Sequence, residues 1–147
     1  MPDWECATAF MPKTIHYAKL KQDIEGWPDT WKGSPDDIVV GTTIVQAMLP
    51  FVQVMVKKHL APTTIHRHMG NLWLLGGEVI SRLHHDSESK GLSGHELLLR
   101  FVEEDGGPIS RHNATEGEQK TFDGTCRKLH RFLEEQMQYC SRDNGKY

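Results

Sequence analysis

Hydrophobic positions repeat every three or four residues in four segments of the chain, which is the spacing of one buried face of an α-helix. The first segment, from Ile38 to Val56, predicts a helix. Pro50 is expected to kink or divide this helix, because proline removes one backbone donor. The second segment predicts a helix from about Pro62 to Leu83, since a proline suits the first helical turn.

Two further helices are predicted from patterns typical of helix N-termini. Ser93 with Glu96 has the spacing of a capping box, in which a hydroxyl and a carboxylate satisfy backbone N–H groups, and so has Thr115 with Glu118. The first box predicts a short helix through the apolar run Leu97 to Val102, and the second opens a longer helix. No segment has the alternation of a half-buried strand. The apolar face of the longer helix comprises Phe122, Cys126, Leu129, Leu133, Met137 and Cys140.

These elements predict an all-α fold, a single orthogonal bundle of about four core helices. A chain of 147 residues suits one domain and can bury a core without disulfides or metal. We expect the helical core at residues 36–140, an irregular N-terminal extension at 1–35 and a flexible C-terminal tail at 141–147. The predicted core comprises Phe51, Met55, Ile65, Met69, Leu72, Val79, Leu98, Phe101, Phe122, Leu129 and Leu133.

The N-terminal extension contains several large aromatic residues among prolines, namely Trp4, Phe10, Trp27 and Trp31. Tryptophans in such a segment are expected to cover an exposed edge of the core, with Trp27 and Trp31 as packing anchors. The alternative is an arm that binds a partner protein.

Positive charge is concentrated where the first predicted helix meets the second. Lys57, Lys58 and Arg67 lie there with three histidines, and no acidic residue occurs between Asp37 and Glu78. Because the whole chain has a formal net charge of -3, this cluster favours a local anionic partner over general affinity for polyanions. Nucleic acid is the first candidate, and an ordinary solvated surface is the alternative. The three histidines are His59, His66 and His68.

Helical geometry places the polar residues of this region on outward faces. If the apolar face of the second helix packs inward, the step of about 100° per residue turns Thr63, Arg67 and Asn71 outward. Lysine and arginine hold phosphates, whereas Arg67 and Asn71 have donors suited to base edges in a major groove. The last helix exposes cations in the same way. The predicted DNA-binding residues are Lys57, Lys58, Thr63, Thr64, Arg67, Asn71, Arg127, Lys128 and Arg131.

Metal binding and catalysis have weaker support in the sequence. Among the close histidine and cysteine pairs, only Cys126 and His130 have the i, i+4 spacing that places two ligands on one helix face. Because the other pairs point their side chains apart, no metal is expected. The chain has no nucleophile elbow, phosphate loop or dinucleotide fingerprint, and no cofactor is expected. Acid/base chemistry by the carboxylates near Glu103 or by His84 and His85 is an alternative, but we do not expect an enzyme.

Cysteine usage and the N-terminus predict a cytoplasmic protein. The three cysteines are widely spaced and form no CxxC pair, which favours reduced thiols, and the first residues lack a basic signal region. The uncharged segment Ile38 to Val56 approaches the length of a membrane span. Because polar residues interrupt it and its apolar positions form a stripe, we expect a buried helix and no membrane partner.

The order of the predicted helices resembles the core-binding domain of tyrosine recombinases and phage integrases, over roughly Pro50 to Gln138. The resemblance is based on LAPTTIHRHMGNLWLLG, on LSGHELLLRFVEE in place of the short third helix, and on TFDGTCRKLHRFLEE in place of the final helix. It implies half of a helical clamp around duplex DNA. The family's separate catalytic domain has no counterpart, because the chain lacks His-x-x-Arg, and Tyr139 and Tyr147 lack catalytic surroundings.

Two functional hypotheses follow from this pattern. The first is a stand-alone, non-catalytic DNA-binding module, from a mobile element or a regulator. The second is a protein-interaction or assembly domain of the same helical fold, with a partner protein or self-association in place of DNA. The basic cluster and the resemblance favour the first, and the net negative charge favours the second.

Overall fold

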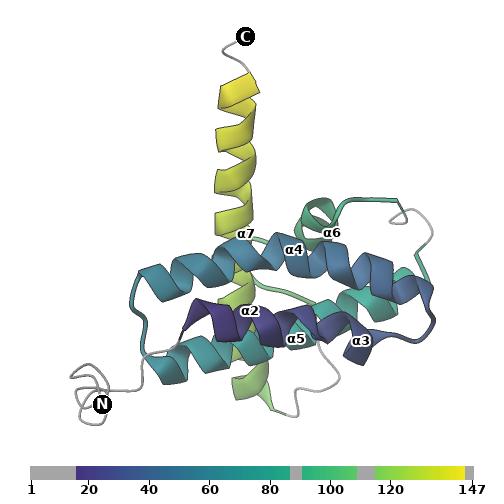
Figure 1. Ribbon diagram of the computed structural model, residues 1–147, viewed down its shortest axis with the longest axis horizontal. Helices are drawn as coiled ribbons and strands as arrows, with labels where there is room; N and C mark the ends of the chain where they lie inside the picture. The colour runs from purple at the N-terminus through teal and green to yellow at the C-terminus, as the bar shows by residue number, and fades with distance from the viewer. Residues whose placement is uncertain (1–15, 87–90, 109–114, 145–147) are drawn as a thin grey trace.

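The computed structural model describes residues 16–86, 91–108 and 115–144, with side chains as far as Gln138 in the last range. The fold is all-α: no strand forms in the described ranges, where an isolated bridge joins Glu103 to Gly106. Figure 1 shows α4 and α5 running side by side in opposite directions, with α7 crossing them. The helices are α2 (Tyr17–Glu25), α3 (Trp27–Trp31), α4 (Asp36–Lys57), α5 (Pro62–Leu83), α6 (Gly94–Phe101) and α7 (Glu116–Asn144).

The helix starts follow the local sequence signals closely. α5 runs from Pro62 to Leu83, as predicted. The Ser93 hydroxyl accepts the backbone N–H of Glu96 at 3.2 Å and caps α6. The Thr115 hydroxyl accepts the N–H of Glu118 at 3.1 Å, one residue before α7. Both hydroxyls satisfy donors that a helix N-terminus leaves without an intrahelical partner.

Of the two outcomes expected at Pro50, a kink or a division of the first helix, the division is wrong. α4 continues from Asp36 to Lys57 with Pro50 inside it. The missing proline N–H leaves the carbonyl of Gln46 without its intrahelical donor, but packing on both sides of this position holds the helix together. By length and composition α4 meets the requirement for a membrane span, as core helices of globular proteins also do. Its residues Ile44 and Met48 are fully buried inside the bundle.

The expectation of an irregular extension is also wrong for the part that the structure describes. Residues 17–31 form the two short helices α2 and α3, and Pro28 occupies the first turn of α3. Trp31 is buried as predicted, and its Nε1 donates to the carbonyl of Trp73 at 3.0 Å. A Cβ on Gly76 would overlap the Trp31 ring, so a glycine in α5 makes room for the indole. Trp4 and Phe10 lie outside the described residues.

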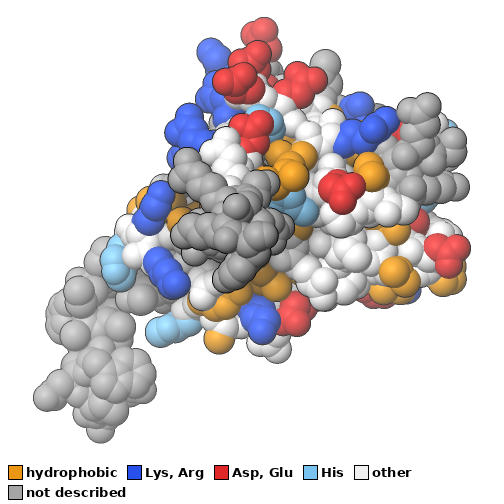
Figure 2. Space-filling model, turned by 90° about the horizontal axis from the view of Figure 1, so that it is seen from above, with side chains coloured by type: hydrophobic (Ala, Val, Ile, Leu, Met, Phe, Trp, Pro, Cys, Tyr) orange, Lys and Arg blue, Asp and Glu red, His pale blue; other side chains and the backbone are white. Residues whose placement is uncertain are grey.

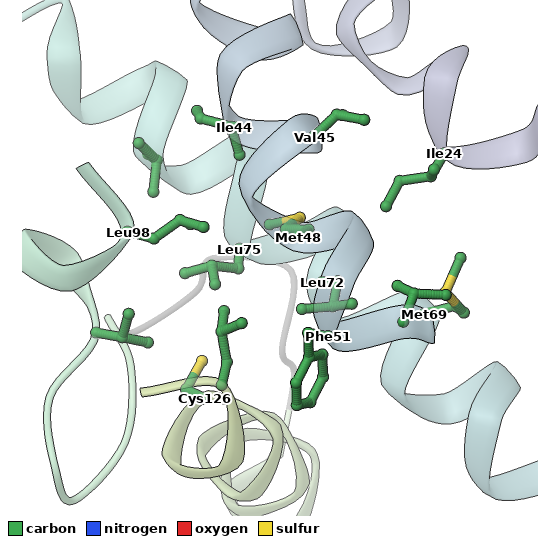
Figure 3. Close-up of a cluster of buried hydrophobic side chains, with 14 of the residues drawn as sticks. Ile24, Ile44, Val45, Met48, Phe51, Met69, Leu72, Leu75, Leu98 and Cys126 are labelled. Carbon is green, nitrogen blue, oxygen red and sulfur yellow. The ribbon is translucent and has the colours of Figure 1, made fainter. Parts of the chain in front are cut away.

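The core forms where all these helices meet. In Figure 3, Ile24 from α2, Met48 from α4 and Leu98 from α6 converge with residues of α5 and α7. The predicted core residues are buried except Phe101, which is half-buried. Met137, predicted on the apolar face of the last helix, is 46% exposed. Figure 1 gives the reason, because α7 continues beyond the bundle and leaves its C-terminal turns without a neighbour.

α4 and α6 approach each other at Gly94, the first residue of α6. A Cβ on Gly94 would overlap the carbonyl group of Thr43, so the two backbones are in direct contact. The side chains that follow, Leu97 and Leu98, are buried beneath this crossing. The position of α6 is therefore set by the main chain as well as by its apolar side chains.

Candidate nucleic-acid interface

An open groove of about 660 Å³ lies between α5 and α7, and we call it the α5–α7 groove. It brings together Arg67 of α5 and three cations of α7, while no carboxylate in the described part of the chain lines it. Figure 2 shows several Lys and Arg side chains at the upper left beside Asp and Glu, and further Lys and Arg at the right and below, so side chains of both signs are spread over this face. The residues lining the groove are Arg67, His68, Thr121, Gly124, Thr125, Arg127, Lys128 and Arg131.

The three cations of α7 reach the groove because the opposite face of that helix is apolar. Leu129 and Leu133 are fully buried against the bundle, so Arg127, Lys128 and Arg131 point outward. Arg131 lies three and four residues after the other two, so all three are close neighbours on one helix surface. Such like charges repel by a few tenths of a kcal/mol per pair, and a bound anion would relieve this repulsion.

None of the four groove cations forms an ion pair with a carboxylate of the described residues. Other cations of the molecule are paired, such as Lys32 with Asp29 at 2.9 Å and Arg82 with Glu78 at 3.6 Å. Exposed lysines such as Lys57 and Lys58 also lack an ion pair to the described residues, but the groove gathers four such cations, and their combined field is available to an anion from solution.

Beneath the cations, polar side chains join α5 to α7. The Asn71 amide donates to the Thr125 hydroxyl at 2.8 Å and to the Thr121 carbonyl at 3.4 Å. The Nδ1 atom of His68 lies 2.7 Å from the same hydroxyl of Thr125. His68 and Thr125 are both buried, at 4% and 1% exposure, so this cluster fixes the two walls of the groove relative to each other.

His68 experiences the positive field of the groove directly. Its burial, followed by the charges of Lys128 and Arg67, lowers the pKa of its imidazole to about 4. The imidazole is therefore neutral at physiological pH. Its Nε2 atom is buried and makes no hydrogen bond to the described residues. This leaves one buried polar atom of the groove without a partner.

Four of the nine residues predicted to bind DNA line the groove, namely Arg67, Arg127, Lys128 and Arg131. The other cations, Lys57 and Lys58, are exposed at the end of α4, outside the groove. Thr63 is exposed and precedes Arg67 by one helical turn, while Thr64 is half-buried. Thr63 and Arg67 therefore lie on the same face of α5, close to the corner where α4 ends.

The Asn71 side chain makes hydrogen bonds within the protein. Its side-chain N–H groups are directed to Thr125 and Thr121 of α7, so they serve a contact between helices. An amide used in this way does not present the donor and acceptor pair that reads an adenine edge. Asn71 also lines a shallower hollow of about 390 Å³ that shares Thr121 with the α5–α7 groove.

The sequence placed His68 in the basic cluster but not among the predicted DNA-binding residues, and Thr125 was not identified. A signal was present, because Thr125 lies three residues after Phe122 and four before Leu129, inside the apolar stripe of α7. His68 lies similarly between Ile65 and Leu72 on α5. A polar residue at the centre of an apolar face needs a buried partner, and two such residues on two helices are candidates for each other.

Several other reactive side chains of the described residues are buried or paired. Burial, and then the charge of Asp123, raises the pKa of the Cys126 thiol to about 12, so this thiol is unreactive. His130, its predicted neighbour on α7, lies 3.4 Å from Glu134. His84 lies 3.0 Å from Asp37. Across the described residues, no group of three or more His, Cys, Asp or Glu side chains could hold a metal ion.

Comparison with known proteins adds no relative: no family model, curated protein or solved structure matches this chain.

Proposed function

We propose that this protein is a non-catalytic DNA-binding module whose α5–α7 groove contacts the phosphate backbone of duplex DNA. The observation that carries the proposal is the composition of the groove, which has four cations, no carboxylate among the described lining residues and no ion pair for any of these cations. In protein–DNA complexes, arginine and lysine side chains most often contact the phosphate groups of the backbone.

The shape of the cationic surface suits an extended polyanion better than a small anion. Arg127 and Arg131 follow α7 over one turn, and Arg67 lies on the facing helix. Lys57 and Lys58, exposed at the end of α4, and Thr63, exposed in the first turn of α5, are further candidates for phosphate contacts. Several cations spread along two helices match a row of phosphates, which follow each other along each strand at about 3.4 Å of rise.

The net charge of -3 is compatible with this function, because a ligand in contact with the groove experiences the local field. Charges further away than about 8 to 10 Å are largely screened at physiological ionic strength. The helix order α4, α5, short α6 and long α7 is also the order on which the resemblance to the integrase core-binding domain is based. We propose a clamp-like contact of the same kind, without recombinase chemistry.

The test is fluorescence anisotropy with a labelled duplex at several salt concentrations. The groove variant carries Lys128→Ala and Arg131→Ala, and the matched control carries Lys19→Ala and Lys21→Ala on α2, which removes the same charge from exposed positions outside the groove. Each phosphate contact contributes a slope of about -0.9 in the logarithm of affinity against the logarithm of salt. We expect the groove variant to lose about two units of slope and the control to behave like the wild type.

Equal binding by the groove variant, the control and the wild type would contradict the proposal. So would a loss of affinity as large in the Lys19 and Lys21 control, because the effect would then follow net charge. Either result favours the second hypothesis, a protein-interaction or assembly domain of the same fold, which is then tested by measuring self-association in solution.

A further inference from the structure

The hydrogen bonds below the groove define which nitrogen of His68 carries its proton. Thr125 Oγ1 accepts an N–H from Asn71, and the hydroxyl has no other acceptor among the described residues than His68 Nδ1, 2.7 Å away. Donation from Thr125 to Nδ1 therefore satisfies both the Thr125 hydroxyl and Nδ1, and the neutral imidazole carries its hydrogen on Nε2. The donor that remains, Nε2–H, is the buried atom without a partner.

An unpaired buried donor is unfavourable, and here it lies in the lining of a groove that also holds Arg67 and Lys128. These two are the cations whose charges act on His68, with Arg127 and Arg131 completing the charged lining. No carboxylate of the described residues lines the groove on either helix. A negative charge from outside would therefore stabilise the two neighbouring cations and the imidazole together.

We propose that Arg67, Lys128 and His68 form a subsite for one phosphodiester group of the nucleic-acid backbone, and that occupation of this subsite places a proton on His68. The inference rests on the proposed function and adds to it the ligand group, the residues that hold it and a dependence on pH. Arg67 and Lys128 bind the phosphate oxygens, while His68 takes up one proton from solvent at Nδ1 and becomes an imidazolium. Nδ1–H then donates to Thr125 Oγ1, so the Thr125 hydroxyl changes from donor to acceptor in this hydrogen bond.

The sign of the pH dependence follows from linkage between proton and ligand. In the free protein the pKa of His68 is about 4, so its imidazole stays neutral down to pH values near 5. The bound phosphate cancels part of the positive field and raises this pKa, so that the complex binds more protons than the free protein. Affinity therefore rises as the pH falls. If the bound imidazole regains its ordinary pKa of about 6.5, affinity rises roughly tenfold between about pH 7.5 and pH 5.5.

The experiment compares DNA affinity at these two pH values for the wild type, for His68→Gln and for His66→Gln. His66 is exposed, lies two residues away on α5, and lines a different pocket with Trp27 and Trp73, so it is a matched control. Because exposed histidines also gain charge on acidification, the informative quantity is the affinity ratio between the two pH values. We expect His68→Gln to lose roughly a tenfold factor from this ratio and His66→Gln to retain it.

A second measurement does not depend on a variant that folds. The imidazole resonances of His68 in the wild-type protein are followed by NMR as a function of pH, with and without a saturating DNA duplex. A rise of the His68 pKa in the complex supports the proposal. Binding that leaves the His68 pKa near its free value, or a pH ratio unchanged in His68→Gln, overturns the subsite while the proposed function stands. Absence of salt-dependent DNA binding overturns both.

Discussion

The imidazole Nε2 of His84, at the end of α5, lies 3.0 and 3.1 Å from the two carboxylate oxygens of Asp37, at the start of α4. The same carboxylate accepts the backbone N–H groups of Gly33 and Ser34 at 2.7 and 3.0 Å. One buried acid therefore joins α4, α5 and the turn after α3. The three donors satisfy a group that would otherwise be costly to bury.

The contact between His84 and Asp37 predicts a loss of stability in acid. Burial alone would raise the pKa of Asp37, but the hydrogen bonds from His84, Gly33 and Ser34 outweigh it and hold the pKa below its usual value. A carboxyl with a lowered pKa stabilises the fold while it is ionised, so this contribution is lost as the pH falls below about 4. Asp37→Asn should cost roughly 1 to 3 kcal/mol at neutral pH and weaken the acid dependence.

Urea unfolding at a series of pH values measures this effect. Asp36→Asn is the control, because Asp36 is the adjacent, exposed acid in the first turn of the same helix. The interpretation would be wrong if the Asp37 variant kept the acid dependence of the wild type, or if the Asp36 variant lost the same amount of stability.

A second prediction concerns the space that α5 leaves for Trp31. Gly76→Ala places a methyl group where the indole lies, and it should destabilise the fold by roughly 1 to 3 kcal/mol through overpacking. Gly70→Ala on the same helix has nothing within 4 Å of its Cβ, and it should stabilise the protein by about 0.5 to 1 kcal/mol through helix propensity. Urea unfolding followed by tryptophan fluorescence gives both values. Equal effects of the two substitutions would contradict the predicted packing.

A third prediction separates the buried part of α7 from the part beyond the bundle. Leu129→Ala should cost roughly 2 to 5 kcal/mol, because this side chain is fully buried. Met137→Ala should change the free energy of unfolding by less than about 0.5 kcal/mol, because its side chain is 46% exposed. Thermal unfolding of the two variants provides the comparison. A large loss in the Met137 variant would mean that the end of α7 packs against something in solution.

The fourth prediction concerns Asn71, which sequence reasoning assigned to base recognition. Because its amide donates to Thr125 and Thr121, Asn71→Ala should reduce stability by roughly 0.5 to 1.5 kcal/mol. The affinities of the Asn71→Ala variant for two DNA duplexes of different sequence should fall by the same factor. Unfolding and anisotropy measurements on the same preparation test this. A selective loss on one duplex, with unchanged stability, would restore the role in base recognition.

The part of the fold that was predictable from sequence is the part with local signals. The limits of α5 and the caps at Ser93 and Thr115 follow from residues a few positions apart. α2 and α3 were missed for a physical reason. α2 buries Leu20 and Ile24, and α3 has five residues, so both depend on packing against the core rather than on their own propensity.

The same distinction applies to the candidate site. Outward cations such as Arg127 and Arg131 were predictable, because the apolar stripe of one helix defines its exposed face. The cluster of His68 with Thr125 joins residues 57 positions apart, and no local pattern says that these two residues meet. The hydrogen bonds of Asn71 were not predictable for the same reason, since its partners are 50 and 54 positions away.

The backbone contact between Gly94 and Thr43 limits how the protein can change over evolution. Most positions of α6 can exchange one apolar side chain for another of similar volume, and the core adjusts. Position 94 has no such freedom, because any side chain would push α6 away from α4 and open the layer that holds Leu97 and Leu98. A distant relative that keeps this crossing should therefore carry a glycine immediately after its helix-capping serine, even where the surrounding sequence has diverged beyond recognition.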